Sequence, residues 1–128
     1  MSHKISLVVD DEPSVRNYIV AVLEGDGFQT IEAENGVHAL ELMHEFGGTV
    51  DLLVSDIKMP LMDGFALLER MRAEPSLQMI PVVLLTGNLD AARGAVGADG
   101  VLVKPFEPAE LIAMIAKLTQ QDAATATV

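Results

Sequence analysis

Short apolar segments alternate five times with segments of helical periodicity along this chain, and this alternation constrains its fold more than any other feature. Each apolar segment is too brief for a buried helix, which is typical of a strand that is covered on both faces. The expected strands cover residues 5–9, 28–33, 52–56, 81–86 and 101–104. In the segments between them, Pro13 and Pro108 stand where the first residue of a helix tolerates proline.

This order of elements predicts a parallel sheet with helices on both faces, because parallel neighbours need right-handed crossover connections. The expected fold class is therefore α/β: a (βα)5, flavodoxin-like, doubly wound parallel sheet with the strand order 2-1-3-4-5. At 128 residues the chain is long enough for one domain with a real core and too short for two.

Composition excludes several classes of function. The 19 acidic residues against 8 basic ones give a formal net charge of −11, which repels nucleic acid and anionic membrane surfaces. The chain has no cysteine, and therefore no disulfide, thiolate metal site or thiol nucleophile. No apolar run approaches the length of a membrane span, and the amino terminus does not resemble a signal peptide. We therefore expect a cytoplasmic protein that binds neither nucleic acid nor membrane directly.

Charged or hydroxyl-bearing side chains stand at the carboxyl ends of four expected strands. Asp10 and Asp11 follow the first strand, and Asp56 ends the third. Thr86 ends the fourth strand and Lys104 the fifth. Because the carboxyl ends of parallel strands meet at one edge of the sheet, where open α/β sheets bind their ligands, we expect these side chains to lie together.

Three carboxylates at one edge repel each other strongly unless a cation lies among them. Oxygen ligands without histidine or cysteine favour Mg2+, which keeps several waters and takes one or two carboxylates directly. Lys104 adds a fixed ammonium group and Thr86 a hydroxyl donor, and both are suited to the oxygens of a phosphoryl group. The pattern therefore predicts a pocket for Mg2+ and a transferred phosphoryl group.

Five motifs in this order resemble a known family. They are Val9–Glu12 after the first strand, Asp56 with Met59-Pro60, Met62–Gly64, Leu85–Gly87 and Val103–Phe106. The chain resembles the receiver domain of two-component response regulators over nearly its whole length. The resemblance implies a receiver domain at residues 1–120, while residues 121–128 are small and polar and are expected to form a flexible tail.

The resemblance also implies roles for the acidic residues. Asp56 would be the phosphoacceptor, which receives a phosphoryl group from the phosphohistidine of a sensor histidine kinase or a phosphotransfer protein. Asp11 and Asp56 would bind Mg2+ directly, together with the main-chain carbonyl of Lys58. Asp10 would act through a metal-bound water.

The remaining implied roles concern the phosphoryl group and the signal. Lys104 and Thr86 would hold the phosphoryl oxygens, and the Lys104–Pro105 bond would be cis. Such a domain is a signalling phosphoacceptor rather than an enzyme, although it promotes its own phosphorylation and dephosphorylation. Phosphorylation would draw Thr86 inward and change the contacts with a downstream protein target or an output domain.

Two departures from the family pattern affect signalling. The chain between Thr86 and Lys104 is shorter than in the usual receiver by about one helical turn, so the fourth helix, within residues 89–96, is expected to be short. Val101 stands where the family usually has an aromatic residue on the fifth strand. The family's coupled movement of a threonine and an aromatic side chain therefore lacks its aromatic partner here.

Three other classes of protein are weighed against this interpretation. A haloacid-dehalogenase-type phosphatase would use Asp10 as its nucleophile and needs a second aspartate where Glu12 stands. A flavodoxin-like FMN carrier needs a small, glycine-bearing phosphate loop after the first strand, whereas acids at that place repel a phosphate. A receiver fold that serves only as a docking module, with weak or atypical switching, stays open as an alternative.

Overall fold

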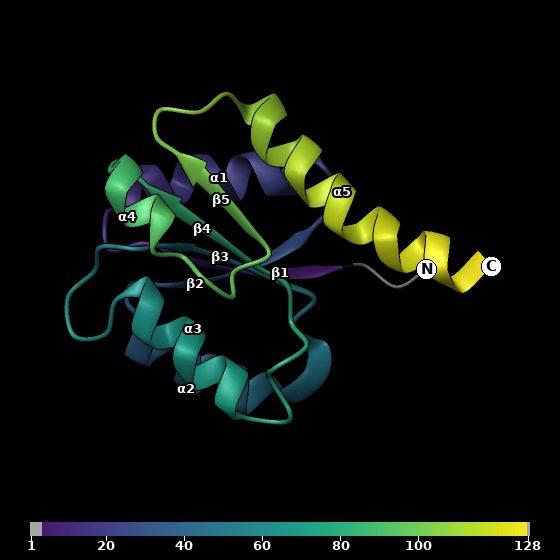
Figure 1. Cartoon of the computed structure of the whole chain (residues 1–128), viewed down its shortest axis with the longest axis horizontal. Helices are drawn as coiled ribbons and strands as arrows, with labels where there is room; N and C mark the ends of the chain where they lie inside the picture. The colour runs from purple at the N-terminus through teal and green to yellow at the C-terminus, as the bar shows by residue number, and fades with distance from the viewer. Residues whose placement is uncertain (1–3, 128) are drawn as a thin grey trace.

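The computed structural model describes residues 4–127 as a five-stranded parallel sheet covered by helices (Figure 1). The strands are β1 (Ile5–Val9), β2 (Gln29–Ala33), β3 (Leu52–Asp56), β4 (Val82–Thr86) and β5 (Gly100–Val103). The helices are α1 (Pro13–Gly25), α2 (Gly36–Phe46), α3 (Gly64–Ala73), α4 (Leu89–Arg93) and α5 (Pro108–Thr127), with a short 3-10 helix η1 at Gly47–Thr49. The strand order is β2-β1-β3-β4-β5, so the predicted fold and topology are confirmed.

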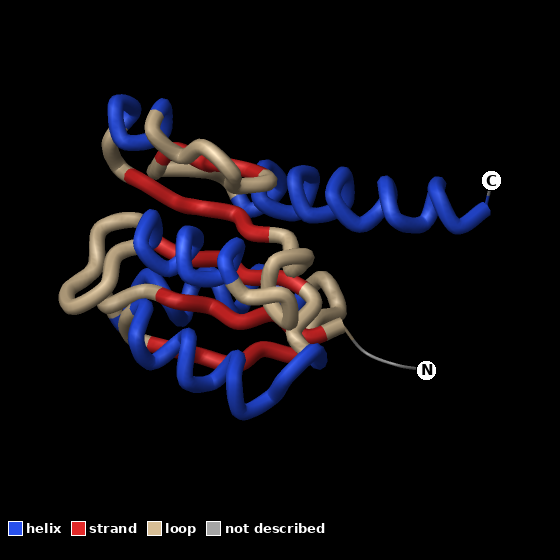
Figure 2. Tube along the Cα trace, turned by 60° about the horizontal axis from the view of Figure 1, so that its bottom comes forward, coloured by secondary structure: helices blue, strands red, loops and turns tan. Residues whose placement is uncertain are grey.

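The register of the sheet brings the carboxyl ends of its central strands to one edge. Val9 is paired with Ala33 of β2 on one side and Ser55 of β3 on the other. One residue further along, Asp56 pairs with Leu85 of β4, and the next pair is Thr86 with Val103, one residue before Lys104. Figure 2 shows the strands side by side as one sheet. The residues that follow β1, β3, β4 and β5 therefore emerge together.

The apolar core lies on both faces of the sheet. Successive residues of a strand point to opposite faces, so Leu7 and Val9 join the core on the side of α2 and α3, whereas Val8 joins the other. On that second side, Ile19 and Leu23 of α1 pack with residues of α5. All residues of β3 and β4 are buried, which explains their continuous apolar sequences. Each fully buried large aliphatic side chain contributes about 1.5–3 kcal/mol to folding.

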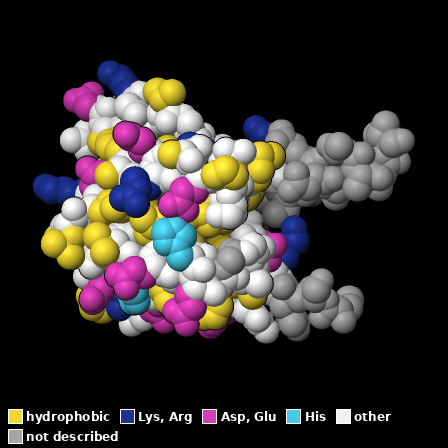
Figure 3. Space-filling view, turned by 90° about the horizontal axis from the view of Figure 1, so that it is seen from below, with side chains coloured by type: hydrophobic (Ala, Val, Ile, Leu, Met, Phe, Trp, Pro, Cys, Tyr) yellow, Lys and Arg dark blue, Asp and Glu magenta, His cyan; other side chains and the backbone are white. Residues whose placement is uncertain are grey.

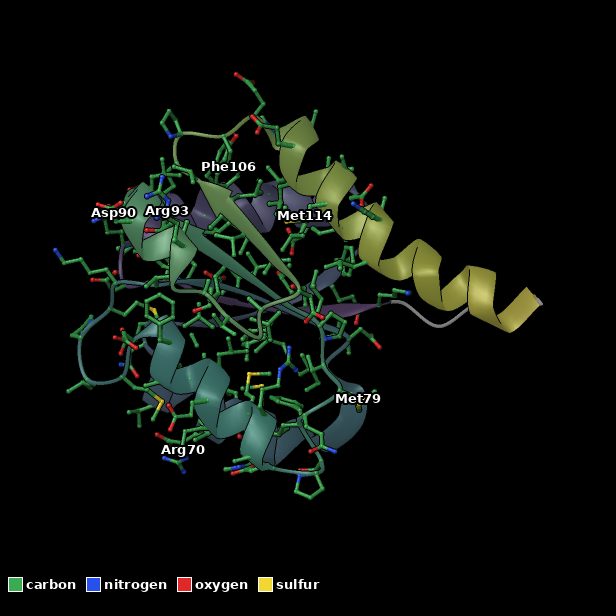
Figure 4. All side chains as sticks on the ribbon, in the orientation of Figure 1. Arg70, Met79, Asp90, Arg93, Phe106 and Met114 are labelled. Atoms are coloured by element: carbon green, nitrogen blue, oxygen red, sulfur yellow. The ribbon has the colours of Figure 1, made fainter. Side chains whose placement is uncertain are left out.

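Helix α4 is short, as the sequence predicts. It has five residues, none of them buried. The Asn88 side chain caps it by accepting hydrogen bonds from the backbone N–H groups of Asp90 and Ala91. Figure 4 shows Asp90 and Arg93 on this helix, where their side chains lie 3.6 Å apart. Because α4 buries so little, it is the helix least anchored by apolar packing.

Helix α5 continues to Thr127 and therefore passes through residues 121–127, for which the sequence predicts a flexible tail. Its inner face contributes the buried side chains of Leu111 and Ile115 to the core. Within residues 4–127, no helix combines the length and the apolarity that a membrane span requires. Figure 3 shows acidic side chains spread over the face formed by α2 and α3, in keeping with the net charge of −11.

Candidate functional site

A cavity of about 790 Å3 opens at the carboxyl edge of the sheet. Its lining includes five of the six predicted site residues, namely Asp11, Asp56, Lys58, Thr86 and Lys104. Asp10, the sixth, is buried beside it, and oxygens of Asp10, Asp11 and Asp56 lie within 4.8 Å of one another. The structure therefore brings together all the residues that the sequence assigns to the site.

Asp10 is held from three directions. Its backbone N–H donates to the carbonyl of Ala33 at 3.1 Å, and its Oδ1 accepts from the N–H of Glu12 at 2.9 Å. Its carbonyl accepts from Arg16 at 2.7 Å. The other carboxylate oxygen, Oδ2, is buried and has no hydrogen-bond partner among the described residues. Its nearest charged neighbour is the Lys104 ammonium, at 3.6 Å.

Asp56 and Lys104 face each other across the cavity. The Lys104 ammonium donates to Asp56 Oδ1 at 3.1 Å and lies 3.6 Å from Asp10 Oδ2. Lys104 follows β5 directly, and the Lys104–Pro105 peptide bond is cis, as the resemblance implies. The next residue, Phe106, packs its ring 6.3 Å from that of Tyr18 on α1, so the segment after β5 is anchored to the body (Figure 4).

Burial sets the acidity of both inner carboxyl groups. Desolvation raises the pKa of Asp56 above its ordinary value, and the nearby Lys104 charge lowers it by a smaller amount. Desolvation also raises the pKa of Asp10, where the Glu12 amide works against the shift and the Asp56 charge adds to it. One ammonium group is therefore too little positive charge to compensate these carboxylates fully.

The chemistry of the cluster fits a divalent cation with a preference for oxygen. Asp10, Asp11 and Asp56 supply carboxylates only, with no imidazole or sulfur atom in the group. The buried Oδ2 of Asp10 accepts no hydrogen bond from the described residues, and a water or cation would satisfy it. Hard oxygen ligands in this number suit Mg2+, which binds through few carboxylates and keeps several waters.

Gly64 lets the connection after β3 pass close behind Asp56. A Cβ atom at Gly64 would lie 2.6 Å from the Asp56 carbonyl oxygen and 2.9 Å from Ile57 Cα. The Gly64 N–H donates to the Ile57 carbonyl at 2.8 Å, and Asp63 caps α3 by accepting from the Ala66 N–H. The Asp63-Gly64 pair, which alone predicts only a turn, thus fixes the backbone of Asp56.

Thr86 lines the cavity, but its hydroxyl is engaged with the loop that follows β4. It accepts from the Asn88 N–H at 3.0 Å and donates to the Asn88 carbonyl at 3.3 Å. Val101, at the position that is usually aromatic in the family, is partly buried on β5. In this structure, therefore, the Thr86 hydroxyl stabilises the start of the α4 segment and does not contact Asp56.

The family-model comparison matches residues 6–116 to the "Response regulator receiver domain". The chain belongs to this family. Its receiver is 39% identical over 132 residues to "Response regulator Rre1" of Synechocystis, a match that covers 98% of this chain and 56% of that protein. Other relatives are named as a DNA-binding response regulator, a DNA-binding transcriptional regulator and a sensor kinase. The receiver spans about half the length of several curated relatives it matches.

Solved receivers have the same fold. The chemotaxis response regulator CheY4 of Vibrio cholerae superposes with a TM-score of 0.81 at 30% identity, covering 91% of this chain and 98% of that one. The receiver domain of sensor histidine kinase PA1611 from Pseudomonas aeruginosa gives 0.83 at 26% identity, covering 91% and 97%. That receiver is described with a magnesium ion coordinated in the active site cleft.

Family membership makes this chain a receiver domain of the two-component signalling type. The phosphatase and FMN-carrier alternatives are not favoured. One residue that contacts the site, Arg16, lies outside the sequence motifs. Arg16 reaches the Asp10 carbonyl from α1, and only its place one helical turn beyond the acidic pair could have drawn attention to it.

Proposed function

We propose that Asp56 is the phosphoacceptor of this receiver, and that it takes a phosphoryl group from the phosphohistidine of a sensor histidine kinase or a phosphotransfer protein. The observation that carries the proposal is the 3.1 Å contact between Asp56 and Lys104 inside a cavity that opens to solvent. Asp56 is 9% exposed, so its carboxylate is reachable from the cavity and largely shielded elsewhere. An accessible carboxylate in direct contact with a fixed cation suits phosphoryl transfer.

The chemistry needs little from the protein beyond position and charge. An Asp56 carboxylate oxygen would attack phosphorus as the bond to the donor's imidazole nitrogen breaks, which leaves an aspartyl phosphate and a free imidazole. Lys104 would neutralise part of the charge on the transferred oxygens. We further propose that small phosphodonors react in the same way, so that the receiver promotes its own phosphorylation, and that attack by water later reverses it.

The acidic cluster supports a site for Mg2+ in this reaction. Asp11 and Asp56 would bind the ion directly with the main-chain carbonyl of Lys58, and Asp10 would act through a water. Bound there, the ion would supply the positive charge that brings an anionic phosphodonor toward a carboxylate. Two observations support this assignment. Asp10 Oδ2 is buried and accepts no hydrogen bond from the described residues. The receiver of PA1611 is described with a coordinated magnesium ion.

The proposed signal begins at Thr86. Its hydroxyl would leave the Asn88 backbone and turn to the phosphoryl oxygens, which removes two hydrogen bonds from the start of the α4 segment. Because no residue of α4 is buried, little apolar packing resists that change. The rearranged segment would alter contacts with a downstream protein or an output domain. We also propose that the receiver domain comprises residues 1–120. We propose that it acts in the cytoplasm, where ATP is available to phosphorylate a sensor kinase.

The test is the intact mass of the protein after incubation with acetyl phosphate and Mg2+. The wild type is expected to gain one phosphoryl group only when Mg2+ is present. Asp56→Asn should gain none, whereas Asp90→Asn, an exposed acid on α4, should behave as the wild type. If the wild type gains no mass although it binds Mg2+, the phosphoacceptor proposal is wrong and the docking-module alternative takes its place.

A further inference from the structure

The Arg16 side chain joins two elements at the rear of the candidate site. Its Nη1 donates to the Asp10 carbonyl at 2.7 Å, and its Nε donates to Glu32 Oε1 at 3.0 Å. The arginine side chain is 18% exposed, so most of its length is packed against the protein. Arg16 thus links α1 both to Glu32 near the carboxyl end of β2 and to the backbone of Asp10.

From these contacts we infer that Arg16 is a positioning residue of the metal and phosphoryl site. It holds the Asp10–Asp11 peptide through the Asp10 carbonyl, so that both carboxylates keep the arrangement that binds a divalent cation. The inference rests on the proposed function, since it concerns the affinity of the proposed Mg2+ site. Arg16 touches neither the cavity nor a reacting atom and acts only through its neighbours.

The peptide that Arg16 holds controls both acids. Asp10 is fixed through its N–H by Ala33, through Oδ1 by Glu12 and through its carbonyl by Arg16. The Asp11 side chain is exposed, and it makes no hydrogen bond or ion pair with the rest of residues 4–127. The direction of that side chain therefore depends on the peptide plane before it, and Arg16 holds the carbonyl oxygen of that plane.

Charge alone would give Arg16 the opposite effect. A guanidinium next to a cation site repels the cation, and its removal would strengthen cation binding. Here Glu32 lies 3.0 Å from Arg16, so the pair has no net formal charge. The field of the arginine at the cavity is therefore largely cancelled, while its hydrogen bond to the Asp10 carbonyl remains. The sign of the change in Mg2+ affinity separates the two roles.

Two contacts in different directions also explain why the residue is an arginine. The planar guanidinium offers donors on separate nitrogen atoms, which reach a carbonyl and a carboxylate at once. A lysine has a single nitrogen at the end of a flexible chain and is less able to serve both. Arg16→Lys should therefore restore only part of the function that Arg16→Gln loses.

The experiment is a titration of the full chain with Mg2+, followed by NMR of the backbone amides around the acidic cluster. For Arg16→Gln we expect Mg2+ affinity to fall about tenfold, in the range seen when an outer partner of a metal ligand is removed. Arg16→Lys should fall by about threefold. With saturating Mg2+, the rate of phosphorylation by acetyl phosphate should return to within about twofold of the wild type, because the acceptor and Lys104 are intact.

Glu32→Gln is the matched control, since it leaves the carbonyl contact and removes only the compensating charge. Its loss of Mg2+ affinity should be small and should disappear at high salt, whereas the loss in Arg16→Gln should persist. Arg16→Met keeps the apolar stem without the donors. If Arg16→Gln does not fold, Arg16→Met replaces it, with the same expected fall in Mg2+ affinity.

Unchanged or tighter Mg2+ binding in the folded Arg16→Gln and Arg16→Met proteins would overturn the inference. So would a lower melting temperature with an unchanged Mg2+ midpoint, because that result describes a purely structural residue. A wild-type protein that binds no Mg2+ would instead overturn the magnesium site of the proposed function.

Discussion

The Lys104 ammonium lies 3.1 Å from Asp56 Oδ1 and links the end of β5 to the end of β3 across the cavity. The pair joins residues 48 positions apart in the sequence. Lys104 is 27% exposed and Asp56 13% exposed by side chain, so the contact is only partly screened by solvent. A second acid, Asp10, lies 3.6 Å from the same ammonium. One ammonium group thus lies beside two carboxylates, so the site has a net negative charge that favours the binding of a further cation.

Replacement of Lys104 by methionine should slow phosphorylation without abolishing the acceptor. We expect the rate with acetyl phosphate to fall by about 10²-fold, the usual effect of removing one donor that stabilises charge in a transition state. Mg2+ affinity should not fall, because a positive charge leaves the cluster. Time courses of intact mass measure the rate, and Lys117→Met, at an exposed position of α5, is the control. An unchanged rate in Lys104→Met would contradict the assigned role.

The stability of the metal-free protein should depend on pH through Asp10 and Asp56. Burial raises the pKa of both carboxyl groups above the ordinary value of 3.8, so the folded state keeps protons that the unfolded state has lost. Their contribution to stability is therefore greatest below 3.8 and is lost as the pH rises through the raised values. Urea unfolding with a chelator should show Asp10→Asn gaining stability relative to the wild type from pH 4 to 7.

Added Mg2+ should reverse this dependence, because a bound cation favours the ionised carboxylates. The wild type should then gain stability at neutral pH, and Asp10→Asn should gain less. A difference between the two proteins that stays constant with pH in the chelator would argue against burial as the cause.

The Leu61 backbone is strained in a way that a substitution can relieve. Its φ is 69°, and the Met62 N–H donates to the Pro60 carbonyl at 2.7 Å across it. The side chain is 84% exposed, so it adds little packing. Leu61→Asn should stabilise the protein by about 0.5–1 kcal/mol, because asparagine tolerates the left-handed region. Leu61→Ala keeps the strain and should not. Denaturant midpoints compare the two, and equal midpoints would count against this reason.

Two buried serines allow a comparison of the free energy of unfolding with and without a hydrogen bond to the hydroxyl. Ser6 and Ser55 are both 0% exposed. Ser6 Oγ has no partner among the described residues, whereas Ser55 Oγ donates to the Asp56 carbonyl at 2.9 Å. We expect Ser6→Ala to stabilise the protein by about 1 kcal/mol and Ser55→Ala to destabilise it by about 1 kcal/mol. Thermal unfolding measures both, and shifts of the same sign would contradict the assigned hydrogen bonding.

Most of the fold follows from local patterns in the chain. The strand at residues 52–56 is apolar without alternation because both faces of the sheet are covered, and β3 is fully buried as that pattern predicts. The shortness of α4 follows from chain length and glycines. The boundaries are less predictable, since β5 begins one residue earlier than expected and α5 continues to Thr127. Ends of elements depend on caps and contacts that periodicity does not encode.

The chain by itself determined which residues reach the site. Acids after the first and third strands, a threonine after the fourth and a lysine after the fifth must share one edge once the sheet is parallel. Only the tertiary structure decided how they are paired. It left Asp10 Oδ2 without a hydrogen bond from the described residues, turned the Thr86 hydroxyl toward Asn88 and placed Arg16 on the Asp10 carbonyl. Topology determines where the Cα atom of a site residue lies. Burial, charge and competing hydrogen bonds from distant segments determine which partners its polar atoms contact.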